Sequence, residues 1–220
     1  SFNYHKHIST GEGGVILTSD KKIARKLQLN RNHGEIVVGE KEKHNHNILG
    51  FNFRLGEIES AIGIEQLKKL KSIVKEKRAI AYFLNKFFKK FEGIILPKTL
   101  KDYTHSYYVY TMRIDRTKIK ISKKKIEKFI RSNSLPIGTK YFRLYKTNIL
   151  SSRKFLSRIF SSDKDMNKYI ETNKSINFKN VEDLHKYELL SIGLCDQDYK
   201  IKDYEIILKK FYKFWKKLME

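Results

Sequence analysis

The sequence predicts an α/β protein in two parts. From about Gly56 to Phe91, apolar residues recur at the three- and four-residue spacing of a helix, and this long pattern divides the chain. After it, short apolar runs typical of strands alternate with helical segments. At 220 residues, 40% of them hydrophobic, the chain is long enough to bury a sizeable core. This length allows one large domain or two small ones.

The first part begins with a lysine, a glycine-rich turn, a short strand and a helix. Residues 10–14 read TGEGG, and three glycines in four positions favour a turn with positive φ angles. Residues 15–18 (VILT) are a short run of β character. Ser19 or Asp20 can then cap a helix predicted from Lys21 to about Asn30.

Two turns and a loop connect that helix to the long one. Gly34 follows the predicted helix where a glycine C-cap is expected. Residues 35–48 are polar and are predicted to form a loop. The long helix then begins near Gly56, continues to about Phe91 with or without a bend, and is closed by Gly93.

The second part alternates strands and helices. Residues 106–114 (SYYVYTMRI) form the clearest strand pattern, and Ser122 is placed to cap a basic amphipathic helix. Residues 137–142 are predicted to return as a second strand. Residues 151–178 are polar and give no clear pattern, and an amphipathic helix is predicted from about Lys202 to the end.

The composition limits the classes of partner. Lys and Arg number 47 against 24 Asp and Glu, a net charge of +23, which would suit nucleic acid or a phosphorylated ligand. The basic residues are spread along the whole chain, which favours solvated helix faces over a nucleic-acid surface. No apolar run is long enough to span a membrane. The single cysteine, Cys195, excludes an internal disulfide framework and favours a reducing cytoplasm.

Several segments, in order, resemble one family of enzymes. They are SF at residues 1–2, Lys6, TGEGGVIL at 10–17, RNHG at 31–34, HNILGFNFR at 46–54, and HSYYVY at 105–110. By these segments the chain is similar to the DegT/DnrJ/EryC1/StrS aminotransferases, which are fold-type I, pyridoxal-phosphate-dependent sugar aminotransferases. The similarity is densest up to about residue 75.

The resemblance implies a partial fold-type I aminotransferase: a truncated αβα large domain over residues 1–72, followed by a connecting helix and a small α/β C-terminal domain over residues 73–220. It covers the second half of such an enzyme. The segment carrying the aspartate that pairs with the pyridine nitrogen of the cofactor is therefore expected before Ser1. The cofactor it implies is pyridoxal 5′-phosphate.

Three residues match cofactor-binding positions of that family. Lys6 is the candidate catalytic lysine, which bonds covalently to the cofactor and moves a proton as general base and acid. Ser1 and Asn52 match a hydroxyl and an amide that donate to the cofactor phosphate, Asn52 in the neighbouring protomer. The family resemblance thus implies a homodimer with shared active sites. On the residues alone, Ser1 can equally be a polar chain end, and Asn52 a loop residue bonding its own backbone.

The substrate region departs from the family pattern. Where relatives commonly carry a histidine-containing stretch, residues 139–145 read TKYFRLY, so Lys140, Arg143 and Tyr145 are the candidate contacts to a diphosphate or to sugar hydroxyls. The implied reaction moves an amino group, with glutamate as the expected donor, to a nucleotide-linked keto-sugar for polysaccharide or amino-sugar biosynthesis. Two alternatives remain: an inactive remnant of such an enzyme, and a basic α/β module that binds anions or nucleic acid.

No metal site is expected. The histidines form two H-x-H pairs, His5 with His7 and His44 with His46, and no cysteine or H-E-x-x-H motif accompanies either pair. Gly11, Gly13 and Gly14 are interpreted as turn glycines, because the spacings of the known phosphate-binding loops are absent.

Overall fold

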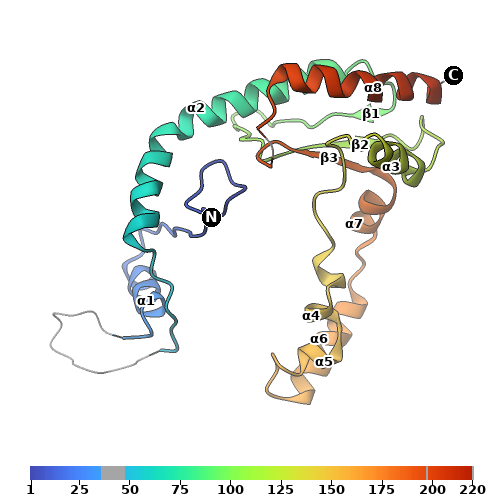
Figure 1. Cartoon of the computed structure of the whole chain (residues 1–220). Helices are drawn as coiled ribbons and strands as arrows, with labels where there is room; N and C mark the ends of the chain where they lie inside the picture. Colours follow the sequence, from blue (N-terminus) through green and yellow to red (C-terminus); the bar gives the residue numbers. More distant parts are fainter. Residues whose placement is uncertain (36–47, 197, 220) are drawn as a thin grey trace. The chain divides into compact units, whose positions relative to one another are not determined.

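The structure divides into two compact units. It is a computed structural model that describes residues 1–35, 48–196 and 198–219. The units are Ser1–Lys75 (unit 1) and Glu76–Glu220 (unit 2), and the division falls within helix α2 (Figure 1). Most of the predicted loop at residues 35–48 lies outside the described residues.

Helix α1 (Lys21–Arg31) forms where it was predicted. The Asp20 carboxylate caps it, because Oδ1 accepts hydrogen bonds from the backbone N–H groups of Lys22 at 2.7 Å and Ile23 at 3.1 Å. At the other end, the Gly34 N–H donates to the Leu29 carbonyl at 2.7 Å, and Gly34 has a φ of +77°. The predicted glycine ending of this helix is confirmed.

The strand predicted at residues 15–18 is wrong. This segment is extended but pairs with no strand in the described chain, and the side chains of Val15, Ile16 and Leu17 are 58%, 69% and 88% exposed. A strand is stabilised by its ladder of hydrogen bonds and by cross-strand side-chain contacts. The apolar composition that predicted a strand here therefore lacks the pairing that would make one.

Helix α2 (Glu57–Phe88) is one continuous helix of 32 residues. Its second half carries a buried stripe at helical spacing, made of Ile80, Ala81, Leu84 and Phe88, each at most 2% exposed. Gly93, with a φ of +77°, then turns the chain toward the sheet.

Unit 2 is built around a three-stranded antiparallel sheet in the order β1-β2-β3. The strands are β1 (Ile94–Ile95), β2 (Val109–Ile114) and β3 (Leu189–Gly193). Val109 lies opposite Gly193, Arg113 opposite Leu189, and Ile94 opposite Ile114. The prediction of β2 is confirmed, whereas β3 was not predicted.

The region after β2 differs in part from its prediction. Helix α3 (Lys123–Ser132) forms, although the Ser122 side chain makes no capping hydrogen bond. The strand predicted at residues 137–142 is wrong. In the structure this segment forms a single antiparallel bridge, between Gly138 and Ser191. Tyr141 and Phe142 are 55% and 70% exposed, so no buried face holds a longer strand in place.

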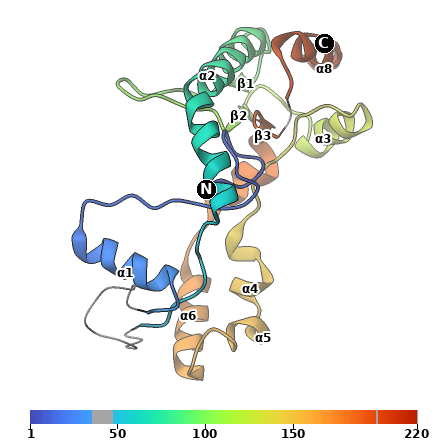
Figure 2. The ribbon, with the colours of Figure 1, turned by 60° about the vertical axis from the view of Figure 1, so that its left-hand side comes forward.

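Short helices fill the stretch that gave no clear sequence pattern. Figures 1 and 2 show them as an arm of unit 2 that leads away from the sheet and returns to β3. In order they are the 3₁₀ turn η1 (Leu144–Lys146), α4 (Asn148–Ser151), α5 (Arg153–Leu156), α6 (Asp163–Ser175), α7 (Lys179–Asp183) and the π-helical turn η2 (Leu184–Glu188).

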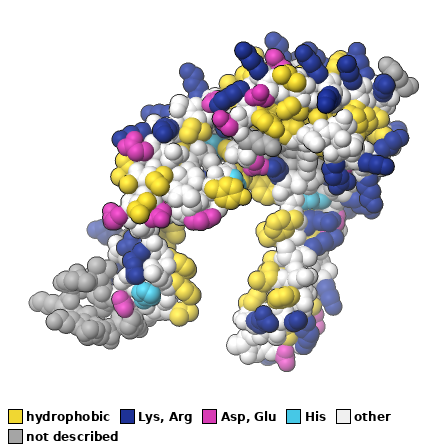
Figure 3. Space-filling model, viewed as in Figure 1, with side chains coloured by type: hydrophobic (Ala, Val, Ile, Leu, Met, Phe, Trp, Pro, Cys, Tyr) yellow, Lys and Arg dark blue, Asp and Glu magenta, His cyan; other side chains and the backbone are white. Residues whose placement is uncertain are grey.

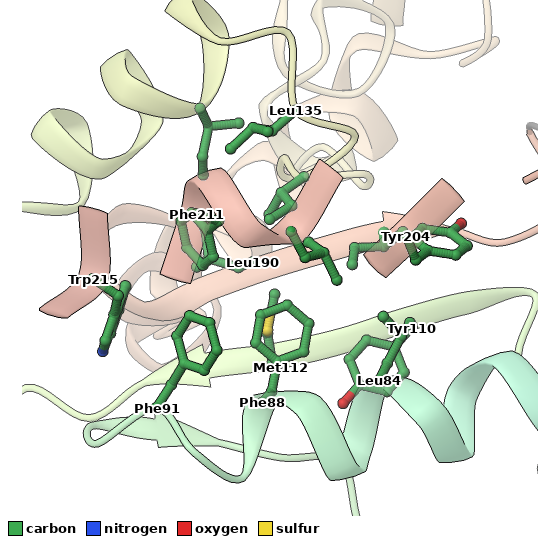
Figure 4. Close-up of a cluster of buried hydrophobic side chains, with 14 of the residues drawn as sticks. Leu84, Phe88, Phe91, Tyr110, Met112, Leu135, Leu190, Tyr204, Phe211 and Trp215 are labelled. Carbon is green, nitrogen blue, oxygen red and sulfur yellow. The ribbon is translucent and has the colours of Figure 1, made fainter. Parts of the chain in front are cut away.

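Helix α8 (Ile201–Met219) closes the core of unit 2 and confirms the predicted C-terminal helix. Figure 4 shows aromatic side chains of α2 and α8 meeting beside the sheet. The rings of Phe88 and Phe211 lie 6.3 Å apart between centroids. Two polar atoms of this core are hydrogen-bonded: the Tyr110 hydroxyl donates to Asn85 Oδ1 and Trp215 Nε1 to the Glu92 carbonyl, both at 2.8 Å.

Candidate active site

The candidate lysine lies on a loop closed by backbone hydrogen bonds. The Phe2 N–H donates to the Gly13 carbonyl at 2.9 Å, and the Thr10 N–H donates to the Phe2 carbonyl at 3.0 Å. Within the loop, the Lys6 N–H donates to the Asn3 carbonyl at 3.0 Å and forms a tight turn. The sequence before the glycines therefore folds back on itself, and Lys6 lies within the closed loop.

Side-chain hydrogen bonds also join the two ends of this loop. Asn3 Nδ2 donates to Glu12 Oε1 at 2.6 Å, and the Thr10 hydroxyl donates to the Glu12 carbonyl at 2.7 Å. The Ser9 hydroxyl donates to the Phe2 carbonyl at 3.1 Å and accepts from the Gly11 N–H at 3.0 Å. Glu12 thus has a structural role, because it joins the two ends of the loop.

Two glycines allow the loop to pack closely. A Cβ added at Gly13, where φ is +144°, would lie 2.9 Å from Leu55 Cδ1 and 3.0 Å from Thr10 Oγ1. A Cβ at Gly63 of α2 would lie 3.3 Å from Thr10 Cγ2. Thr10 itself is only 6% exposed. The loop is therefore held against the first turns of α2 as well as to itself.

Lys6 and Ser1 lie on this same loop. The Lys6 side chain is half-buried, whereas Ser1 is exposed and its hydroxyl oxygen accepts from the Asn3 N–H at 3.4 Å. Asn3 Oδ1 is buried and has no hydrogen-bond partner in the part of the chain that the structure describes. An acceptor buried in this way, one turn from Lys6, is suited to a ligand that carries a donor group.

Asn52 lies on a separate segment of unit 1. This segment pairs with the end of α1: the Phe51 N–H donates to the Asn30 carbonyl at 2.8 Å and the Phe53 N–H to the Arg31 carbonyl at 2.9 Å. The Asn52 side chain is exposed, and its Oδ1 accepts from the Arg54 N–H at a long 3.4 Å. Asn52 therefore makes the local backbone contact of a loop asparagine, and its side chain is exposed.

Arg54 is anchored by Asn32. Its Nη1 donates to Asn32 Oδ1 at 2.6 Å. Asn32 lies directly opposite Asn52 in the antiparallel bridge between the two segments. The bond fixes the segment that carries Asn52 to the end of α1.

The three candidate substrate residues separate into two groups in unit 2. Arg143 and Tyr145 meet at Glu182: Arg143 Nη1 lies 2.6 Å from Glu182 Oε2, and the Tyr145 hydroxyl donates to Oε1. Lys140 instead pairs with Asp196, and its N–H donates to the Ser191 hydroxyl at 2.8 Å. The structure thus brings together two of the three.

The charges around Glu182 shift one another's pKa values. The hydrogen bond from Lys146, followed by that from Tyr145, lowers the pKa of Glu182 to about 2. Burial, with the charge of Arg143 as a further cause, lowers the pKa of both Lys123 and His185.

Sequence reasoning missed Lys123, Lys146 and Glu182. Lys123 is 5% exposed, and its ammonium donates to Thr139 Oγ1 at 2.8 Å and to the His185 carbonyl at 2.7 Å. Nothing in the sequence distinguishes it from the lysines that follow it. Glu182 is remote in the sequence from the residues it joins, so no local pattern marks it.

The described residues offer neither a grouped set of metal ligands nor a membrane-spanning helix. Within residues 1–35, 48–196 and 198–219, no three His, Cys, Asp or Glu side chains are grouped to hold a metal ion, while His44 and His46 lie outside those ranges. No helix in this part of the chain is long and apolar enough to cross a membrane. Figure 3 shows Lys and Arg side chains spread over α2, α8 and the arm on the face in view.

Two curated proteins similar to the chain have names that include a nucleotide-linked sugar. A UDP-4-amino-4,6-dideoxy-N-acetyl-beta-L-altrosamine transaminase of Helicobacter pylori is 38% identical over 93 residues, which are 40% of this chain and 24% of that protein. A GDP-perosamine synthase of Caulobacter vibrioides is 30% identical over 115 residues, which are 52% of this chain and 30% of that protein. The chain thus spans a third or less of these two relatives.

A solved structure shows the fold. The Helicobacter pylori aminotransferase PseC, involved in the biosynthesis of pseudoaminic acid, matches with a TM-score of 0.74 at 22% identity. The match covers 99% of this chain and 52% of PseC. The predicted fold class, part of a fold-type I aminotransferase, is confirmed.

The family match includes the candidate lysine and the substrate segment. The model of the DegT/DnrJ/EryC1/StrS aminotransferase family matches residues 1–166, which contain the Lys6 loop, Asn52 and residues 139–146. The aminotransferases of this family depend on pyridoxal 5′-phosphate. The predicted resemblance is confirmed: the chain belongs to the DegT/DnrJ/EryC1/StrS aminotransferase family.

Proposed function

We propose that this chain provides the catalytic lysine of a cytoplasmic, pyridoxal-phosphate-dependent aminotransferase. The enzyme moves an amino group, with glutamate as donor, to a nucleotide-linked keto-sugar for polysaccharide or amino-sugar biosynthesis. The observation that carries the proposal is Lys6, held on a hydrogen-bonded loop within the part of the chain that matches the family. Under this proposal residues 1–72 belong to the cofactor-binding domain, and residues 73–220 are the connecting helix and small domain.

The residues present fit the cofactor. An amine for covalent attachment is offered by Lys6, and neutral donors for a phosphate by the Ser1 hydroxyl and the Asn52 amide. The buried acceptor Asn3 Oδ1 is also suited to a ligand donor. When bound, pyridoxal phosphate supplies an electron sink for the carbanion formed at the substrate Cα. Lys6 Nζ, unprotonated at the start, would take the proton from that carbon as general base and give the same proton up as general acid.

The substrate class is supported by the relatives and by charge. The names of the two curated relatives include UDP-linked and GDP-linked sugars. The diphosphate of such a substrate is an anion, and Lys140, Arg143 and Tyr145 offer cationic and hydroxyl donors to it. We propose these three residues as substrate contacts.

Replacing the lysine tests the function. We expect Lys6→Ala to abolish transamination and the visible absorbance of the bound cofactor while leaving the circular dichroism spectrum unchanged. Lys22→Ala, which removes an exposed lysine of α1, is the matched control and should retain both activity and absorbance. If Lys6→Ala keeps both, another lysine does the chemistry and the assignment is wrong.

We also propose a homodimer in which Asn52 serves the active site of the partner subunit. Exposed apolar side chains near Asn52 and on the first half of α2 offer surface for such an interface: Leu49, Phe51, Phe53, Ile58, Ile62, Ile64 and Leu67 are all at least 43% exposed. The exposed Asn52 amide can donate across that interface without adding charge.

Mixing two variants tests whether sites are shared. A hydrogen bond to a charged phosphate contributes about 1.5–3 kcal/mol, so Asn52→Ala should weaken cofactor retention about ten- to a hundredfold. When Lys6→Ala and Asn52→Ala subunits are mixed, a heterodimer with shared sites has one doubly damaged site and one intact site, and activity should partly return. If heterodimers form, as native mass spectrometry can show, and no activity returns, Asn52 does not serve the partner.

A further inference from the structure

Glu182 is the meeting point of three donors from one short segment. Its Oε2 accepts from Arg143 Nη1 at 2.6 Å, and its Oε1 accepts from Lys146 Nζ at 2.7 Å and from the Tyr145 hydroxyl. Arg143 directly precedes the turn η1, and Tyr145 and Lys146 lie within it. Glu182 lies on α7. The ring of Tyr145 stacks on Phe178 with 3.9 Å between centroids and 7° between planes, which fixes the direction of its hydroxyl.

The charges of this group do not balance. Arg143 and Lys146 are both paired with the single carboxylate of Glu182. The charge of Arg143 also acts on Lys123. Lys123 has its own ion-pair partner, because its Nζ lies 3.3 Å from Glu127 Oε1. The set of Arg143, Lys146 and Glu182 therefore carries one net positive charge and suits an anion with more charge than a carboxylate.

The donors around Glu182 are of the kinds that also bind a phosphoryl group. Its two carboxylate oxygens receive an arginine on one side, and a lysine and a hydroxyl on the other, as two oxygens of a phosphoryl group would. The side chains are within reach of solvent, with Glu182 31% exposed, Arg143 34% and Lys146 51%. A ligand can therefore approach the donors without unfolding the core.

We propose that Arg143, Tyr145 and Lys146 form a binding site for the diphosphate of a nucleotide, and that Glu182 occupies this site in the absence of ligand and is displaced by it. This deepens the proposed function, on which it rests for the class of ligand. The new elements are Lys146, added to the contacts proposed above, and Glu182 as a competing internal anion.

Release of Glu182 is by exchange and not by protonation. Its pKa is lowered to about 2, chiefly by the hydrogen bond from Lys146, so it stays ionised at neutral pH. A nucleoside diphosphate must therefore compete with a permanent carboxylate. Part of the binding free energy is used in that competition, and removing the charge of Glu182 recovers it.

Calorimetric titration with UDP and with GDP tests this competition in the protein that carries the chain. We expect Glu182→Gln to bind the preferred nucleotide at least threefold more tightly than the unaltered protein, and Arg143→Gln and Lys146→Gln to bind it at least tenfold more weakly. Glu188→Gln is the matched control, because Glu188 also pairs with an arginine, Arg113, at 3.3 Å. It should leave the affinity unchanged.

The outcomes separate this proposal from the proposed function. If Glu182→Gln binds equally or more weakly, Glu182 is a positioning residue and the competition is disproved. If Arg143→Gln binds normally, or if no variant binds either nucleotide, the site itself is disproved. Inorganic pyrophosphate is titrated in parallel. If the diphosphate is the group recognised, the affinities of the variants for pyrophosphate should fall in the same order as their affinities for the nucleotide. None of these titrations depends on Lys6. Lys6→Ala should therefore bind the preferred nucleotide normally, even if the absorbance of this variant shows that the aminotransferase assignment is wrong.

Discussion

The two units of this chain are ordered by different means. In unit 2, side chains from α2, β2, β3 and α8 share one buried aromatic and aliphatic core, and Phe88, Tyr110, Leu190 and Phe211 are fully buried. In unit 1, by contrast, only Ile8 and Leu29 of the described hydrophobic side chains are buried. The loop that carries Lys6 is held instead by hydrogen bonds from backbone and polar side chains.

Unit 2 has the packed core, whereas unit 1 carries the lysine that is proposed to react. A packed core tolerates little change in volume, because its side chains interdigitate. A loop held by directional hydrogen bonds places one amine in space while leaving apolar surface, such as Ile58 and Leu67, for another surface to cover. In this account unit 2 gives stability and the anion site, while unit 1 gives the lysine and the proposed shared interface.

The largest expected difference is in core truncation. Phe211→Ala should lower the free energy of unfolding by about 3–5 kcal/mol, because it removes a fully buried ring from unit 2. Leu17→Ala, at a residue of unit 1 that is 88% exposed, should change it by less than about 0.5 kcal/mol. Urea denaturation followed through the fluorescence of Trp215 measures both. Similar losses for the two variants would remove the contrast between the units.

A smaller effect is expected where unit 1 is held by its backbone. Gly34 has a φ of +77°, and a Cβ there would lie 1.9 Å from the Ile48 carbonyl oxygen. Gly34→Ala should therefore cost at least about 1–2 kcal/mol locally, from the left-handed conformation alone. It should speed hydrogen exchange at the Phe51 and Phe53 amides while leaving the core of unit 2 protected.

Gly14→Ala is the control for that change. Gly14 lacks the positive φ of Gly34, and a Cβ there meets nothing within 4 Å. Its exchange pattern should match that of the unaltered protein. Unchanged exchange in Gly34→Ala as well would show that the close approach of Gly34 to residue 48 does not hold this segment.

The sequence predicted the elements whose pattern is local. Helices α1, α2 and α8 follow from apolar spacing and from a capping residue such as Asp20, both of which lie within a few positions along the chain. Strands depend on partners. Residues 15–18 have β composition and no ladder, while β3 pairs along its whole length although its serine and glycine obscured its strand pattern.

The candidate site was predictable to the same extent. Lys6 stood out because its neighbours form an ordered motif within one short stretch. The contacts of Arg143 and Tyr145 with Glu182 join residues 39 and 37 positions apart, and only the folded arm brings them together. Lys123 was missed for a related reason, since its burial depends on Thr139 and the η2 turn that it contacts.

The central claim is that Lys6 bonds to the cofactor, and chemical trapping tests it most directly. The protein that carries this chain is loaded with one equivalent of pyridoxal phosphate, reduced with borohydride to make the bond permanent, digested, and mapped by mass spectrometry. We predict that the pyridoxyl group is found on Lys6, and that prior addition of glutamate, the proposed donor, reduces this label by displacing the lysine. Label on a different lysine, or label scattered among surface lysines and insensitive to glutamate, would contradict the account.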